Sequence, residues 1–344
     1  MSVVYKPFVA DSCHQSFLDS QKLMAANFSD KVASSTEFLE WQYLKNPFGK
    51  AIGFIAYDGD DPVSQLFLTF QQVVFDGELH VVAVASNACT MESHRGQGHF
   101  HKIFMLLVDE ARKLDVPFIW AYPNPNSLRG FIKTGFRIVK ECSLELVPVS
   151  ILGIVRDLLY KKPFSIDASV GDASVDMGQL SKFSLLTSDT QVQWPKFDVK
   201  SVRDRVWRVP LTHEQLLWRY LSNSMRKYYP MFHEATGTTV ILRFVNLFGL
   251  TTALIMKSDA RTQSVYQKVV KDLRIDLKGK VSFLTTMPSE FTRPGPRNFI
   301  RGRFLVPARL SPRKFPLAIY PIRSSIPLAS PESYDFVLGD YEAL

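Results

Sequence analysis

Arg95-Gly96-Gln97-Gly98 is the stretch from which the fold of this chain can be worked out. An apolar run from Leu79 to Met91 predicts a strand before it, and an amphipathic pattern predicts a helix from about Gly98 to Leu114. Two glycines let the backbone turn sharply and approach a ligand closely, because no Cβ stands in the way. A helix that begins there leaves its first amide donors unpaired at the positive end of its dipole. The order of strand, glycine turn and helix therefore indicates an anion site, to which Arg95 adds a fixed cation.

The segments after this helix follow a specific order. A short apolar run from Val116 to Tyr122 precedes Pro123-Asn124-Pro125-Asn126-Ser127, a second predicted helix from Ser127 to Lys133, and Gly135-Phe136 at the start of another strand. This series resembles the GNAT superfamily of acyl-CoA N-acyltransferases over residues 1 to 148. The resemblance implies an α+β (α/β) fold, the GNAT fold, with a mixed, mostly antiparallel sheet flanked by helices. It also implies acetyl-CoA or another short acyl-CoA thioester as co-substrate and a primary amine as acceptor.

The resemblance assigns roles to particular residues. In the family the glycine loop holds the coenzyme A pyrophosphate, and the preceding strand offers amides to pantetheine and to the thioester carbonyl. The cofactor-binding residues implied here are Thr90, Met91, Glu92, Arg95, Gly96, Gln97, Gly98, His99, Phe100, Asn124 and Phe131. Two positions depart from the family pattern. Phe100 replaces a Gly or Ala, so its ring must turn away from the ligand, and Phe131 replaces a Tyr usually credited with protonating the departing thiolate.

The catalytic residues are harder to assign. Many relatives carry a Glu on the strand before the loop, but this chain has Val82 there and no acid between Glu78 and Glu92. His80 and Glu92 are our candidates for the base, beside His94 and the acidic run 340–342, and Tyr122 is a candidate substitute for the missing acid. His99 and His101 point to different helix faces, so no metal site is predicted.

Composition limits the class of protein. A chain of 344 residues, 46% of them hydrophobic, has length for two domains. Its three cysteines, Cys13, Cys89 and Cys142, are odd in number and far apart, which favours a reducing compartment. Residues 1–10 lack the pattern of a secretory signal, and the longest apolar stretch, 238–256, contains Arg243 and Asn246, which favours two strands over a membrane span. We therefore expect a soluble, cytoplasmic protein without a transmembrane segment.

An internal repeat predicts the domain organisation. Six residues recur at a constant shift of 177 positions: Glu37, Leu39, Trp41, Tyr43, Leu44 and Asn46 return as Glu214, Leu216, Trp218, Tyr220, Leu221 and Asn223. We expect an acyl-CoA-binding domain at 1–148, a connecting helix and linker at 149–199, and a degenerate GNAT-like domain at 200–344. The second copy has no glycine in 256–265, where its loop would fall, so it is not expected to bind coenzyme A in the usual way.

The acceptor stays open at this point. The segment 41–47 is similar to a GNAT subgroup found with surface polysaccharide biosynthesis, which favours an amino sugar. The net charge of +8 is concentrated in residues 291–331, which hold eight Lys or Arg and no acid. That segment suits a solvated surface, a phosphorylated substrate such as a nucleotide sugar, a nucleic acid or an anionic membrane. Two alternatives remain: an aminoacyl-tRNA-dependent aminoacyltransferase, disfavoured by the coenzyme A loop, and a non-catalytic acyl-CoA-binding protein.

Overall fold

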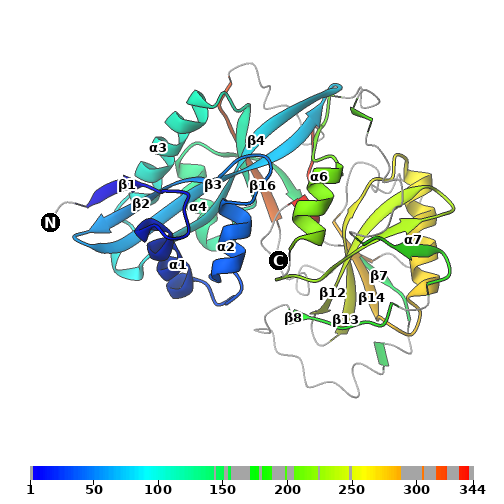
Figure 1. The fold of residues 1–344 in the computed structure, drawn as a ribbon. Helices are drawn as coiled ribbons and strands as arrows, with labels where there is room; N and C mark the ends of the chain where they lie inside the picture. The colour runs from blue at the N-terminus through cyan, green and yellow to red at the C-terminus, as the bar shows by residue number, and fades with distance from the viewer. Residues whose placement is uncertain are drawn as a thin grey trace. The chain divides into compact units, whose positions relative to one another are not determined.

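The chain forms two compact units, each assembled from separate stretches of sequence (Figure 1). The computed structural model describes residues 3–142, 145–150, 154–155, 171–177, 180–187, 198–199, 205–223, 225–247, 250–287, 304–305, 315–323 and 333–340. Unit 1 comprises 1–141, 199–207 and 315–333, and unit 2 comprises 142–198, 208–314 and 334–344. The units are thus not the contiguous stretches that the repeat suggested, because the late segment 315–333 belongs to unit 1.

Unit 1 begins with one strand and two helices. Strand β1 (Val4–Pro7) precedes helices α1 (Gln15–Asn27) and α2 (Thr36–Tyr43). The side chain of Ser35 accepts a hydrogen bond from the amide of Phe38, so Ser35 is the N-cap of α2. The side chain of His14 caps α1 in the same way, by accepting from the amide of Ser16.

Three antiparallel strands form the centre of the first sheet. They are β2 (Ile52–Asp58), β3 (Asp61–Phe75) and β4 (Glu78–Thr90). The turn between β3 and β4 is the pair Asp76-Gly77, with φ of 49° and 79°, which Asp and Gly both tolerate. The turn between β2 and β3 is centred on Gly59 and Asp60.

The elements around the glycine loop match their predicted order. A short 3-10 helix, η1 (Glu92–His94), leads into the loop, and α3 (His99–Lys113), β5 (Phe118–Ala121), α4 (Pro125–Lys133) and β6 (Arg137–Cys142) follow. Strand β5 runs parallel to β4 but pairs with it only at Ala83–Ile119 and Val84–Trp120. Beyond these pairs the two strands share no register, so among the described residues the edge of β4 toward the loop has no strand partner.

Helices cover both faces of this sheet (Figure 1). Successive residues of β3 point to opposite faces. Phe67 stacks on Tyr43 of α2, whereas Leu66 and Leu68 belong to the core that α3 completes with Ile103, Phe104 and Leu107. The predicted class, a mixed sheet flanked by helices, is confirmed.

One strand of this sheet was not expected from the sequence. Strand β16 (Phe315–Pro321) pairs antiparallel with β5, from Ala318–Ala121 to Pro321–Phe118. The strand order is β1-β2-β3-β4-β5-β16-β6, so β16 separates two strands that are close in sequence. Tyr320 packs edge-on against Phe104 and lies over Gly135, and its segment thereby completes the core of unit 1.

Unit 2 contains a second sheet with the order β15-β7-β14-β13-β12-β11-β9, and β8 pairs with β12. Strands β12 and β13 form a hairpin, and β13 continues through α7 into the parallel strand β14. The bounds are β7 (Glu145–Pro148), β8 (Gly171–Asp172), β9 (Phe183–Leu185), β11 (Tyr228–His233), β12 (Thr238–Leu247), β13 (Leu250–Ser258), α7 (Gln263–Asp276), β14 (Phe283–Thr286) and β15 (Phe304–Leu305). The stretch 238–256 is thus two strands, as predicted.

Helix α6 (His213–Leu216) continues into a π-helical turn, η3 (Leu217–Leu221), and η6 (Leu338–Asp340) lies near the end of the described chain. The two-residue strands β10 (Trp207–Arg208) and β17 (Tyr334–Asp335) lie where the sequence passes between units. Among the described residues, no helix is both long and apolar enough to cross a bilayer. Most of the connecting helix expected after residue 149 and most of the basic segment 291–331 lie outside the described residues.

Candidate functional site

The loop before α3 presents backbone donors. Gly96 and Gly98 have φ of 79° and 84°, a conformation that L-residues rarely adopt. Gly98 is the N-cap of α3 and no side chain caps this helix. Within the described part of the chain, nothing accepts from the amides of Gly96, Gln97 or Gly98. A Cβ at either glycine would meet no atom within 4 Å, so the space beside the glycines is open, and amide donors at a helix N-terminus can bind an anion.

Polar side chains surround this loop. The Arg95 Nε donates to the carbonyl oxygen of Thr90 at 3.2 Å, which holds the guanidinium at the end of β4. The side-chain Nε2 of Gln97 donates to the backbone carbonyl oxygen of Ser93 at 3.2 Å. Glu92 is exposed at the start of η1. Arg95 and Gln97 are thus held by backbone carbonyls beside the loop glycines, and the cofactor-binding roles of Glu92, Arg95 and Gln97 stay predictions.

The next two residues contribute amides but turn their side chains inward. His99 is 5% exposed, and its Nδ1 lies 2.7 Å from the Tyr5 hydroxyl. Burial, together with the nearby His94 and Lys102, lowers the pKa of His99. The Phe100 ring packs edge-on against Phe131 with a centroid distance of 5.0 Å. The inward turn expected of Phe100 is therefore observed.

Hydrogen bonding along the end of β4 distinguishes Thr90 from Met91. The Met91 amide donates to the carbonyl oxygen of Val63 at 2.8 Å, on the β3 side. Successive residues of a strand direct their amides to opposite edges, so the Thr90 amide faces the edge that β5 has left. Thr90 fits the role of a backbone donor to a ligand, whereas the amide of Met91 is already used.

An irregularity in β4 produces this arrangement, and sequence reasoning missed it. Phe67 pairs with Ser86 and Gln65 pairs with Cys89, so two residues of β4, Asn87 and Ala88, stand opposite one residue of β3. Asn87 has φ of 52°. The one available signal was an Asn inside an apolar strand, since Asn tolerates positive φ better than most residues.

The side chain of Asn87 ties the bulge to α2. Its amide nitrogen lies 2.6 Å from Gln42 Oε1 and 2.7 Å from the Tyr43 hydroxyl oxygen. The carbonyl oxygen of Asn87 accepts from Gln65 Nε2 at 3.3 Å. Beside it, the Ser86 hydroxyl is buried and has no partner in the described part of the protein. These groups place unusual polarity in the sheet where β4 and β5 separate.

The remaining predicted residues lie just after β5 and at or within α4. Tyr122 is 6% exposed, packs edge-on against Trp120, and comes two residues after the last pair between β4 and β5. Asn124 is the N-cap of α4 and accepts from the Ser127 amide at 2.9 Å. Phe131 is 3% exposed among Phe100 and Phe136, so its ring belongs to the core.

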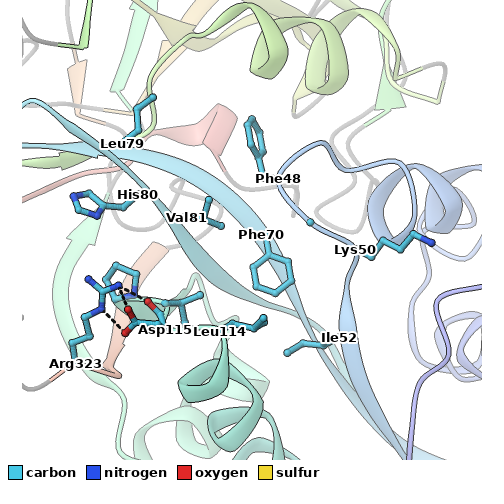
Figure 2. A pocket seen from close by; sticks show the side chains of 13 residues that line it. Phe48, Lys50, Ile52, Phe70, Leu79, His80, Val81, Leu114, Asp115 and Arg323 are labelled. Carbon is cyan, nitrogen blue, oxygen red and sulfur yellow. Dashed lines mark hydrogen bonds and ion pairs between the residues drawn. The ribbon is translucent and has the colours of Figure 1, made fainter.

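His80 lies far from this arrangement. Ten residues of strand separate it from Thr90, which is about 30 Å along β4. Its ring packs against Trp207 with a centroid distance of 5.2 Å, and burial lowers its pKa. His80 instead contributes to the wall of an apolar pocket of about 570 Å³ at the opposite end of α3, which Figure 2 shows beside the ion pair of Asp115 and Arg323. The structure therefore does not bring His80 to the loop.

Two further groups are constrained in ways that bear on mechanism. Burial raises the pKa of the Cys89 thiol to about 12, so it stays protonated at neutral pH and is a poor nucleophile. Asp340, a residue of the acidic run considered as base, is 2% exposed in unit 2, and its carboxylate accepts from Lys257 at 2.6 and 2.8 Å. That ion pair commits Asp340 to the packing of unit 2.

Comparison with known proteins gives relatives by structure alone. The sequence matches no protein-family model and no curated protein. The structure is similar to a GCN5-related N-acetyltransferase from Anabaena variabilis, with TM-score 0.59, 12% identity, and 93% of this chain and 73% of that chain covered.

Two further structures show the same likeness. A probable N-acyltransferase from Enterococcus faecalis has TM-score 0.60 and 11% identity, with 94% of this chain and 73% of that chain covered. The N-myristoyltransferase of Saccharomyces cerevisiae, solved with bound myristoyl-CoA, has TM-score 0.51 and 11% identity, with 84% and 74% covered. The chain described here has the fold of the GCN5-related N-acetyltransferases, the GNAT fold.

Proposed function

We propose that the protein is an acyl-CoA-dependent N-acyltransferase that moves an acetyl or other short acyl group to a primary amine. The observation that supports this most is the row of unpartnered amides at Gly96, Gln97 and Gly98, at the N-terminus of a helix with no side-chain cap. Such a helix end favours an anion through both its donors and its dipole. The GNAT fold, which the chain shares with acyltransferases that include one solved with bound myristoyl-CoA, supports the same assignment.

The chain's own residues divide the work. The loop amides and Arg95 would hold the diphosphate, and the Thr90 amide at the open edge of β4 would donate to the thioester carbonyl oxygen. Removing a donor of this kind typically lowers a rate by about 10²- to 10³-fold. When bound, acyl-CoA supplies an acyl group activated as a thioester. Tyr122, just after β5, would give its proton to the departing thiolate. Phe131 cannot do so, because it has no hydroxyl.

The acceptor that we propose is an amino sugar. Its support is the similarity of the segment 41–47 to a GNAT subgroup associated with surface polysaccharides, which concerns sequence rather than geometry. A cytoplasmic location fits a reaction that uses acyl-CoA and the small number of cysteines. A phosphorylated amine, such as a nucleotide sugar, would suit the basic segment 291–331.

We further propose that unit 2 is a duplicated, degenerate copy of unit 1. The N-caps of α2 and α6, Ser35 and Thr212, are separated by the same 177 positions as the repeat. Each unit also has a hairpin followed by a helix and a parallel strand. The Thr262 side chain caps α7 by accepting from the Val265 amide at 3.3 Å. Because α7 has this cap and α3 has none, the diphosphate site is assigned to unit 1.

Residues of unit 2 also fill the place that corresponds to the bulge of β4. Strand β13 has its own irregularity, between the partners of Ile241 and Leu242. Tyr220, which is Tyr43 shifted by 177, donates to the carbonyl oxygen of Gly339 at 3.0 Å. A Cβ at Gly339 would come within 2.6 Å of the carbonyl oxygen of Met256. The segment η6 therefore occupies this place in unit 2, which supports a copy that binds no thioester.

Calorimetric titration of coenzyme A tests the proposed site. Gly98→Asp places a carboxylate beside the diphosphate, and we expect it to weaken binding at least about tenfold. Gly279→Asp is the matched control, because Gly279 has φ of 80°, a Cβ there also meets nothing within 4 Å, and it lies in unit 2. Equal affinity in wild type and Gly98→Asp, or no affinity in wild type, would refute the proposal.

A second measurement separates an enzyme from a non-catalytic acyl-CoA-binding protein. The missing hydroxyl at Phe131 gives the non-catalytic function its support. Release of coenzyme A thiol from acetyl-CoA, measured with a panel of amino sugars, is expected to exceed the rate without amine. Tight binding of acetyl-CoA with no amine-dependent release across chemically diverse amines would favour the non-catalytic function.

A further inference from the structure

We infer that Asn87 is a positioning residue, whose side chain holds β4 in the bulged form that turns the Thr90 amide toward the thioester. This inference rests on the proposed function and adds to it a residue outside the glycine loop. The side chain of Asn87 donates hydrogen bonds to Gln42 and Tyr43, which lie on α2.

The register of β4 shows what the bulge changes. Phe75 and Glu78 close a two-residue turn, so they exchange hydrogen bonds, and every second residue onward to Ser86 faces β3. Without the bulge this alternation would direct Thr90 to β3 and Met91 to the open edge. The observed bond from the Met91 amide to Val63 shows that the alternation has shifted by one residue. The bulge at Asn87 therefore selects which amide faces the thioester.

The conformation of Asn87 needs support from outside the strand. Positive φ is uncommon for a residue other than glycine, even for Asn, and within a strand it persists when the surroundings hold it. The carboxamide donates to Gln42 and Tyr43, both of which are buried. Helix α2 thus holds β4 in its bulged conformation through these two hydrogen bonds, and the backbone of β4 carries this constraint to the Thr90 amide.

The ¹³C chemical shift of the carbonyl in bound [1-¹³C]acetyl-CoA measures this effect without knowledge of the acceptor. A hydrogen bond to the carbonyl oxygen polarises it and moves the resonance downfield. Relative to free acetyl-CoA, we expect the resonance to move downfield on binding to wild type. This shift should be reduced by at least half in Asn87→Ala and reduced in part in Tyr43→Phe. Coenzyme A affinity should stay within about threefold, because the glycine loop is unchanged.

Two variants separate positioning from simple packing. Asn87→Gly keeps the backbone freedom but removes the carboxamide, so it should also lose the shift if the anchor to α2 matters. Tyr220→Phe makes the Tyr43→Phe change at the repeated position in unit 2, and it should leave the shift at the wild-type value. Melting temperatures are recorded for every variant. If Asn87→Ala does not fold, Asn87→Gly and Tyr43→Phe decide the question.

The outcomes distinguish this inference from the proposed function. Wild type that fails to bind acetyl-CoA overturns both. Wild type that binds with no downfield shift, or variants at Asn87 and Tyr43 that are destabilised but keep the full shift, overturn only the positioning role. Loss of the shift in the Asn87 and Tyr43 variants, with affinity retained and Tyr220→Phe unaffected, supports it.

Discussion

His99, a buried histidine at the start of α3, makes the stability of the folded protein depend on pH. The pKa of this imidazole is lowered in the folded protein, mainly by burial, whereas in the unfolded chain the pKa is about 6.5. Between these values the unfolded chain binds a proton that the folded protein does not. The contribution of neutral His99 to the free energy of unfolding is therefore complete above about pH 7.5. It is lost as the pH falls through about 6.5 toward the pKa of His99 in the folded protein.

This sign gives a prediction for His99→Gln. The free energy of unfolding of wild type, measured by denaturant titration from pH 8 to 5, should fall with decreasing pH, and His99→Gln should show a shallower fall. The burial of His80 also lowers its pKa, so part of the slope should remain. His101→Gln, an exposed histidine on the same helix, serves as the control and should keep the wild-type slope. Identical profiles for wild type and His99→Gln would contradict the prediction.

At the same scale, the sequence predicted some residues well and others not. Gly96, Gly98 and Phe100 could be assigned because a glycine loop followed by a helix is a local pattern. Asn87 could not be assigned, because its role depends on hydrogen bonds to α2, some 45 positions away. His80 was placed at the site only because the strand lacked an acid, and the length of β4 separates it from the loop.

Among the elements, α2 is the one on which the bulge of β4 depends. Its N-cap bond, from the Phe38 amide to Ser35 Oγ at 3.3 Å, satisfies one of the amides that a helix start leaves unpaired. Replacing such a cap with alanine costs about 1 kcal/mol. Loosening the first turn of α2 would also loosen its contacts with Asn87 at the other end.

We therefore predict that Ser35→Ala lowers the free energy of unfolding by about 1 kcal/mol. Thr212→Ala removes the corresponding cap of α6, in which the Gln215 amide donates to Thr212 Oγ1 at 3.2 Å, and should lower the free energy of unfolding by a similar amount. Only Ser35→Ala should reduce the carbonyl shift of bound acetyl-CoA. Circular dichroism during denaturation measures the stability. An equal reduction of the carbonyl shift by both variants would contradict the different roles assigned to the two helices.

On the scale of the whole molecule, prediction from the sequence was limited because a late segment of the chain, β16, pairs with the much earlier strand β5. The elements from β1 to β6 were predictable because each follows from nearby residues, such as the Asp76-Gly77 turn and the Asn124 cap. The pairing of β16 with β5 joins residues about 200 positions apart, and no local pattern in residues 315–321 encodes it. For that reason the sequence suggested boundaries at 148 and 200, whereas unit 1 also requires 315–333.

This difference predicts the behaviour of a fragment. Residues 1–148 alone would lack β16, so the edge of β5 at Ile119 and Trp120, both fully buried in the intact chain, would be exposed. An unpaired apolar edge strand promotes association between chains. The fragment would also lose Tyr320, which packs against Phe104 and Phe136. We expect fragment 1–148 to aggregate or to unfold without cooperativity, and to bind coenzyme A at least about tenfold more weakly than the full chain.

Co-expression of 1–148 with 149–344 provides the control, because the second fragment carries β16. Size-exclusion chromatography should show the two fragments eluting together, and coenzyme A affinity should return toward that of the intact protein. Because the loop from Gly96 to Gly98 is present in every sample, a loss confined to the isolated fragment would be due to the missing strand. A monomeric fragment 1–148 that unfolds cooperatively and binds coenzyme A as tightly as the full chain would show that β16 is dispensable for the site.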